Sequence, residues 1–190
     1  SVVGMPELLK SSRNELVLDW SITALSKEKG IDYERDYSTL YYATSEGVES
    51  LAERGNDEEE LVGRTHWVSF SQQFFSCGYI ADDYFDDDGS DVAVVQSEDP
   101  MYTKHMAAEL TLPLSKDDHA AFNGRFYLGP NHYQTLKDYD IELENQINFG
   151  WSFIAWFSKI LIVPLFNLLD GTGLGYGLII LILKPIMQMT

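Results

Sequence analysis

The densest group of potential metal ligands in this sequence of 190 residues is the acidic run from Asp82 to Gly89, DDYFDDDG. An EF-hand calcium loop needs oxygen ligands at its first and twelfth positions and glycine at its sixth. With Gly89 at the sixth position, Tyr84 and Val95 stand at the first and twelfth, so that loop is excluded. The run is interpreted as a solvated turn between strands, and an irregular calcium site is kept as the alternative.

The other reactive side chains do not form a metal-binding or catalytic pattern. Cys77 lies in an apolar segment with no basic residue nearby to lower its thiol pKa. The sequence contains neither the G-x-S-x-G motif of a serine hydrolase nor a P-loop, and its histidines lack the H-x-x-x-H spacing of a zinc site. We therefore predict no catalytic, cofactor-binding or metal-binding residues, and the protein is not expected to be an enzyme. The histidines excluded as ligands are His66, His105, His119 and His132.

A hydrolase that uses paired carboxylates is the least supported hypothesis, because acidic residues are so common here. With 30 Asp and Glu residues in the sequence, any chosen pair is arbitrary. The separation of the two carboxyl groups, which decides such chemistry, is a three-dimensional quantity. The second acidic run, Asp57 to Glu60, is interpreted as another solvated loop.

Composition narrows the class of protein further. Thirteen basic residues against 30 acidic ones give a net charge of −17. This argues against nucleic acid as a partner, because phosphate contacts need clustered Lys and Arg. A hydrophobic content of 45% argues against a disordered chain, and a single cysteine excludes an intramolecular disulfide.

The charge is concentrated in the first 150 residues, and the remainder is an apolar tail. Residues 151–190 carry a net charge of +1, so residues 1–150 carry −18. Within the tail, WSFIAWFSKILIVPLFNLL (151–169) is apolar on nearly all sides of a helix, which is typical of a helix in lipid or deep in a protein. A buried core helix and a spanning helix are the alternatives to one that lies in the membrane interface.

The placement of three side chains favours the membrane interface over a full span. Trp151 and Trp156 are typical anchors at the level of the lipid headgroups, and Lys159 stands in mid-helix, where spanning is most costly. We therefore predict an amphipathic interfacial helix over residues 150–170, with Trp151, Trp156 and Lys159 as its membrane-interface residues.

The last 20 residues combine a glycine-rich turn with a short apolar run. GTGLGYG (171–177) is followed by LIILIL (178–183), which Lys184 and Pro185 interrupt. A transmembrane helix needs about 20 apolar residues, so residues 171–190 are interpreted as a loop and a truncated start of a span. At the other end, SVVGMPELLKSS lacks the pattern of a signal peptide. Either the chain is cytoplasmic or its export signal lies outside this sequence.

Residues 1–149 are predicted to form a mainly β domain, an antiparallel β-sandwich. Residues 16–24 and 106–114 alternate between apolar and polar side chains, as strands with one buried face do. Pro113 indicates an edge strand or the end of a strand. The shorter strand candidates are residues 37–43, 66–80, 92–96 and 122–128, and the turn signals are Lys29-Gly30, residues 54–57, residues 88–90 and Asn123-Gly124.

A short helix is expected to follow the last of these strands. Pro130 ends the strand, and Asn131 is suited to cap a helix that continues to Lys137. An alternating apolar pattern from Ile141 to Phe149 then leads to the tail.

Five segments form a specific combination in their order and spacing. They are THWVSFSQQFFSCGYIA (65–81), FYLGPNHYQTLK (126–137), INFGW (147–151), the helix that ends in VPLFNLLD, and GYGLIILIL (175–183). The combination is a W-V-x-x-x-Q-Q-x-F strand, a Y-x-G-P turn, a G-W pair that opens an apolar helix, and a G-x-G loop that leads into a span. In this combination the chain resembles YidC, the bacterial membrane protein insertase, in its Gram-negative form, and the resemblance covers roughly residues 14–183.

The resemblance implies a fold, a location and a set of partners. Residues 1–149 would be the C-terminal part of a periplasmic β-supersandwich with its short helix at 131–137. The interfacial helix would lie on the periplasmic face of the bacterial inner membrane, with residues 1–170 on that side. The partners would be the lipid bilayer, nascent membrane proteins, and the Sec translocon with its accessory subunits.

In that family, a positive side chain on the first core helix lies in a hydrophilic groove that receives the substrate. Lys184 is the candidate for it here, although the apolar run before it is short. A junction or a deletion is the alternative interpretation of this segment. The chain would then be a fragment that lacks most of the insertase core and the first part of the periplasmic domain.

A carbohydrate- or peptide-binding β-sandwich attached to a membrane is the alternative function. Aromatic rings that line one concave face would bind sugar, whereas scattered rings would be ordinary strand residues. The tyrosines that suggest this alternative are Tyr33, Tyr37, Tyr41, Tyr42, Tyr79 and Tyr84.

Overall fold

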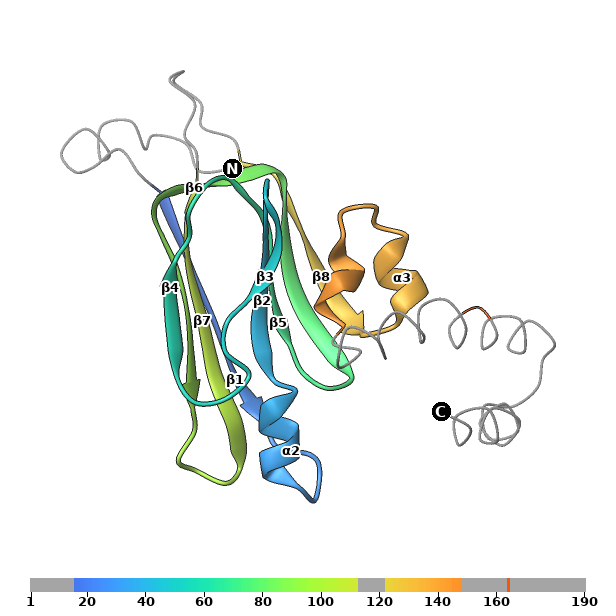
Figure 1. Cartoon of the computed structure of the whole chain (residues 1–190). Coiled ribbons are helices and arrows are strands. Elements are labelled where there is room, and N and C mark those ends of the chain that lie inside the picture. Colours follow the sequence, from blue (N-terminus) through green and yellow to red (C-terminus); the bar gives the residue numbers. More distant parts are fainter. Residues whose placement is uncertain (1–15, 113–121, 148–163, 165–190) are drawn as a thin grey trace. The chain divides into compact units, whose positions relative to one another are not determined.

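The fold is seen in a computed structural model, which describes residues 16–112, 122–147 and 164. The chain divides into two compact units, Ser1–Ile147 and Asn148–Thr190. All of the elements named below belong to the first unit (Figure 1). The predicted fold class is confirmed, because this unit consists mainly of antiparallel strands in two packed layers.

The two layers share one long strand, β6 (Phe75–Gln96). In sheet A the second half of β6 lies between β4 and β7, and β1 forms the far edge beyond β7. In sheet B the first half of β6 lies between β5 and β8, followed by β2 and β3 beyond β5. The other strands are β1 (Leu16–Leu25), β2 (Thr39–Thr44), β3 (Gly47–Ser50), β4 (Asp57–Glu60), β5 (Thr65–Ser71), β7 (Tyr102–Leu112) and β8 (Gly124–Pro130).

The acidic run at Asp82–Gly89 lies inside β6, so its interpretation as a turn between two strands is wrong. The strand leaves its pairing with β5 at Phe85 and enters its pairing with β7 at Asp86, with a register shift before Asp91. Gly89 takes a positive φ of 77°, which glycine adopts at little cost. The bend is held by Ser90, whose hydroxyl donates to the backbone oxygen of Asp86. The bulge therefore redirects one strand from one sheet to the other.

Two further predictions about loops and strands are also wrong. Residues 57–60 are not a loop but strand β4, whose backbone pairs with residues 91–94 of β6. Residues 66–80 are not one strand, because a turn at Gln72–Phe74 separates β5 from β6. The Gln72 amide donates to the Phe75 oxygen (2.9 Å) across that turn. The turn contains neither glycine nor proline, so no sequence signal marked it.

The two predicted strands with alternating side chains are confirmed. Leu16, Leu18, Trp20 and Ile22 face the core from β1 but are only half-buried, because β1 is an edge strand. The partner strand β7 lies between β1 and β6 and is therefore not an edge strand, and Pro113 lies outside the described residues. The core between the sheets is made by Leu40, Val68, Phe70, Phe85, Val92, Val94, Met106 and Leu110, each at most 1% exposed.

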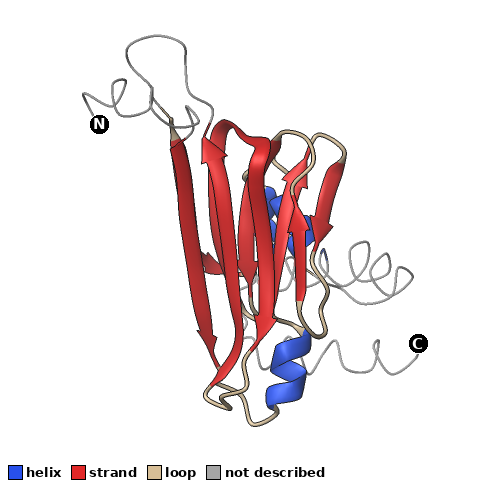
Figure 2. Cartoon of the chain, turned by 90° about the vertical axis from the view of Figure 1, so that its left-hand side faces the viewer, coloured by secondary structure: helices blue, strands red, loops and turns tan. Residues whose placement is uncertain are grey.

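The helices of this unit are short. The predicted helix after Pro130 is α3 (Tyr133–Lys137), and its N-cap is His132, whose side chain accepts from the Thr135 amide, rather than Asn131. The 3-10 helix η1 (Leu143–Gln146) takes the place of the expected alternating pattern. Helix α2 (Ile31–Asp36), at one end of the sandwich (Figure 2), had no sequence signal beyond the turn at Gly30.

Glu34 of α2 holds the loop after β1 with a buried carboxylate. Its oxygens accept from the Lys27 amide (2.9 and 3.0 Å), the Ser26 hydroxyl (2.8 Å) and the Glu28 amide (3.2 Å). Burial raises the pKa of Glu34, but these hydrogen bonds outweigh burial and hold its pKa below the usual value near 4.5. The carboxylate therefore stabilises the fold in its charged form.

We expect Glu34→Gln to lower the free energy of unfolding by about 1–3 kcal/mol at neutral pH, because an amide cannot replace two accepting oxygens and a charge. The contribution of a carboxylate with a lowered pKa is complete above its unfolded value and is lost as pH falls through the folded value. Urea unfolding at decreasing pH should thus show the wild type and the variant converging below pH 4.5. Glu28→Gln, at an exposed carboxylate of the same loop, is the control; a constant gap at all pH values would contradict the prediction.

Candidate functional site

The four side chains predicted to act at the membrane lie outside the described residues. They are Trp151, Trp156, Lys159 and Lys184. Within the tail the structure describes Pro164, which is helical. In the parts of the chain that are described, no helix has the length and apolarity that crossing a bilayer requires.

The described feature that bears on the tail is the segment that leads to it, residues 131–147. This segment lies on the outer face of sheet B, opposite the core between the sheets (Figure 1). We call its contact with the sheet the linker clamp, defined by Trp67, Ser69, Tyr127, Leu136 and Leu143. Four of these residues, Trp67, Ser69, Leu136 and Leu143, are completely buried.

Polar contacts tie the linker clamp together at each end. The Trp67 indole Nε1–H donates to the backbone oxygen of Ile141 (2.9 Å). The Ser69 hydroxyl donates to Oε1 of Gln146 (2.7 Å), which is itself 2% exposed. Both bonds join residues more than 70 positions apart, so they fix where the chain leaves the sandwich.

The strand β8 contributes a third tie to the linker clamp. The Tyr127 hydroxyl donates to the Pro130 oxygen (2.6 Å), and its ring meets Tyr139 edge-on at 5.5 Å. Burial, and to a lesser extent Tyr139, raises the pKa of Tyr127, so the hydroxyl remains a donor at physiological pH. The clamp is thus a neutral, packed contact whose role is positional.

Two reactive groups, the half-buried Cys77 and the buried Lys104, serve structural roles. Burial raises the pKa of the Cys77 thiol, which keeps it protonated and unreactive at neutral pH. Burial lowers the pKa of Lys104, while the charges of Asp36 and Glu53 raise it and so oppose that shift. The Lys104 ammonium donates to the backbone oxygen of Glu53 (2.7 Å), and the residue is completely buried.

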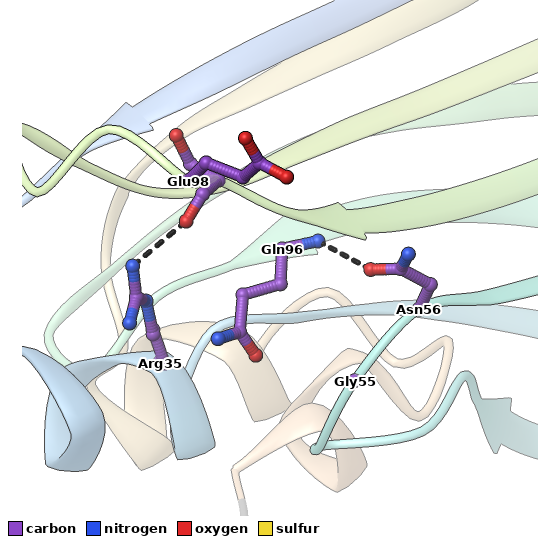
Figure 3. Close-up of a pocket in the computed structure, with 6 residues that line it drawn as sticks. Arg35, Gly55, Asn56, Gln96 and Glu98 are labelled. Carbon is purple, nitrogen blue, oxygen red and sulfur yellow. Dashed lines mark hydrogen bonds between the residues drawn. The ribbon is translucent and has the colours of Figure 1, made fainter.

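An open polar pocket of about 510 Å³ lies beside α2 (Figure 3). Arg35 Nη2 donates to the backbone oxygen of Ser97 (2.8 Å), and the backbone N–H of Gln96 donates to Oδ1 of Asn56 (2.8 Å). Arg35 and Asn56 are therefore each engaged with a neighbouring backbone group. No aromatic ring is among its lining residues, which are Arg35, Gly55, Asn56, Gln96, Ser97 and Glu98.

The tyrosines that suggested sugar binding are scattered over separate parts of the fold. Tyr33 and Tyr37 pack together on α2 at 4.7 Å, and Tyr42 is buried in the core. Tyr79 stacks on Phe126 at 4.4 Å, and the guanidinium of Arg64 covers the ring of Tyr84 at 4.3 Å. Because these rings make separate local contacts and are not gathered at one place, the carbohydrate-binding alternative loses its support.

The His, Cys, Asp and Glu side chains do not assemble a metal centre in the described part of the chain. No three of its His, Cys, Asp and Glu side chains gather as metal ligands would. Each described histidine serves a local contact. His66 Nδ1 lies 3.0 Å from the Asp83 oxygen, His105 Nδ1 lies 3.0 Å from the Thr23 hydroxyl, and His132 Nδ1 lies 2.9 Å from the Thr135 hydroxyl.

Comparison with known proteins gives one family. The sequence model of the family described as "YidC periplasmic domain" matches residues 18–165. The chain is similar to proteins named membrane protein insertase YidC from several bacteria. It is 31% identical to that of Phocaeicola vulgatus over 97% of this chain and 31% of the relative. It is 32% identical to the protein of Bacteroides fragilis, over 95% of this chain and 30% of the relative. It is 29% identical to the protein of Cytophaga hutchinsonii, over 87% of this chain and 28% of the relative. The chain thus spans about a third of the length of the curated relatives it matches.

Proposed function

Because this chain belongs to the YidC periplasmic domain family, we propose that it is part of an insertase that helps inner-membrane proteins insert and fold. The family's domain is periplasmic, so the described β-sandwich lies on the periplasmic side of the bacterial inner membrane. Its role is to hold and orient the segment that joins it to the bilayer. The role is one of scaffolding without catalysis.

The observation that carries this proposal is the linker clamp. Trp67 and Ser69 of β5 hold Ile141 and Gln146, and the sequence reaches Trp151 four residues after Ile147. A flexible linker would leave the domain free to rotate above the membrane, whereas a packed one transmits its orientation. The clamp therefore supports a domain with a defined position relative to the membrane.

The tail residues take the roles that their chemistry favours. Residues 150–170 form the interfacial helix, with Trp151 and Trp156 at the headgroup level and Lys159 directed toward water. Residues 171–190 form a loop and the beginning of a transmembrane helix. Lys184 on that helix is the proposed cation of the substrate groove, where a positive charge favours acidic parts of an incoming segment.

The proposed partners follow from this arrangement. The bilayer contacts the tail, and nascent membrane proteins are the substrates. The Sec translocon and its accessory subunits are proposed to contact the outer surface of the sandwich. A net charge of −17 favours protein or lipid over nucleic acid at that surface.

Flotation with phosphatidylcholine vesicles tests the proposal. We expect the chain to float with the vesicles, and a shortened chain that ends at Ile147 to bind on the order of a hundredfold more weakly, because it lacks the apolar helix. A cooperative urea transition of the shortened chain is the control for its fold. Equal flotation of the two chains would defeat the proposal.

A further inference from the structure

The β5–β6 hairpin ends in an exposed apolar surface that the linker clamp leaves uncovered. Phe74 and Phe75 at its tip are 57% and 62% exposed, and Phe126 and Leu128 on the neighbouring strand β8 are 56% and 71% exposed. We call these four residues the aromatic tip. Large apolar side chains gathered this way mark an interaction site.

Strand register places three of the four side chains on one face. Phe75 pairs with Pro130, Cys77 with Leu128 and Tyr79 with Phe126, so Phe75, Leu128 and Phe126 point to the same side of sheet B. That side faces sheet A, whose edge strand β1 covers Phe126 through Trp20 (ring centroids 5.7 Å apart). Leu128 and Phe75 lie nearer the end of β8, and there the apolar surface is open.

The aromatic tip is uncharged although the protein is strongly acidic. No charged residue occurs from Trp67 to Ala81 or from Phe126 to Leu136. The charges that follow Ala81 and precede Phe126 are Asp82 and Arg125, which neutralise each other in an ion pair (3.2 Å). An uncharged surface can approach a layer of lipid headgroups without electrostatic repulsion. The acidic side chains elsewhere on the domain would be repelled by the phosphate groups of that layer.

The tip is fixed to the segment that leads to the tail. The backbone N–H of Asn131 donates to the backbone oxygen of Phe74 (2.8 Å). Its side-chain Nδ2 donates to the backbone oxygen of Gln72 (2.6 Å). Figure 1 shows the end of β8 beside the β5–β6 hairpin. Ser69, only three residues before Gln72 on β5, holds Gln146 at the other end of the same segment. The tip therefore belongs to the part of the sandwich from which the chain departs toward the tail.

We propose that the aromatic tip is a second membrane contact, in which Phe74, Phe75 and Leu128 enter the headgroup region of a phospholipid bilayer. The choice of a bilayer rests on the proposed function, in which the tail residues bind lipid. Phenylalanine at a hairpin tip gains free energy by leaving water for the interface, and one apolar contact is seldom enough for stable anchoring. Two contacts, one from the tail and one from the tip, fix the tilt of the sandwich as well as its distance from the membrane.

A fluorescent label at the tip tests this contact with the full chain. Phe74→Cys in a Cys77→Ser background leaves one thiol, which is labelled with the environment-sensitive dye NBD. We expect the emission to shift to the blue when phosphatidylcholine vesicles are added. The control label at Val62→Cys, which is 81% exposed and precedes β5 at its opposite end, should not change.

Substitution gives the matching affinity measurement. Phe74→Ser combined with Phe75→Ser should weaken vesicle binding about tenfold, because two apolar side chains lose their transfer to the interface. Val62→Ser should leave binding unchanged. An unshifted tip label on a chain that still floats with vesicles would overturn the tip contact alone, whereas a chain that does not float would overturn the proposed function. If the emission of the tip label shifted to the blue without vesicles as the protein concentration rises, the tip would be a site of self-association. That result would overturn the inference as well.

Discussion

Trp67→Ala is expected to lower the free energy of unfolding by about 3–5 kcal/mol, the range for a large aromatic residue removed from a packed interior. Trp67 is completely buried between sheet B and residues 136–147, where it packs with Ile80, Tyr127 and Leu143. Its removal also deprives the Ile141 oxygen of a donor that lies 2.9 Å away. The cavity and the lost hydrogen bond act at the same place, the linker clamp.

Trp67→Phe separates these two contributions. It keeps most of the ring packing and removes the indole donor, so we expect a loss of about 1–2 kcal/mol, most of it from the unpaired Ile141 oxygen. Urea unfolding gives both free energies. Hydrogen exchange should locate the change in residues 133–147 for both variants, since the clamp holds that segment. A transition midpoint of Trp67→Ala equal to that of the wild type would contradict the account of the clamp.

The strands that alternate in sequence were predictable, because one face of each is buried. This holds for β1 (Leu16–Leu25) and β7 (Tyr102–Leu112), which pair with each other in sheet A. The crossing of β6 from sheet B to sheet A was not predictable in the same way. An acidic run of this kind is also typical of a solvated turn. Only the pairing with β5 and β7 distinguishes a bulged strand from such a turn.

The linker clamp was missed because its partners are distant in the sequence. Trp67 and Ile141 are 74 positions apart, and no local pattern joins them. A signal was nevertheless present in THWVSFS, which is apolar or small at every position after His66. Such a strand is buried on both faces, so a layer beyond sheet B was to be expected. The short helix α3 and the family resemblance, by contrast, followed from FYLGPNHYQTLK and the other quoted segments.

The central claim is that the tail of this insertase-family chain binds the membrane interface through Trp151 and Trp156. The sequence holds four tryptophans, and the other two, Trp20 and Trp67, belong to the sandwich. Quenching of tryptophan fluorescence by vesicles of brominated phosphatidylcholine therefore distinguishes the tail from the body. We expect strong quenching of the wild-type chain, and the loss of most of it in Trp151→Phe/Trp156→Phe at equal amounts of bound protein. Equal quenching of the two chains, or a bound wild-type chain that is not quenched, would contradict the claim.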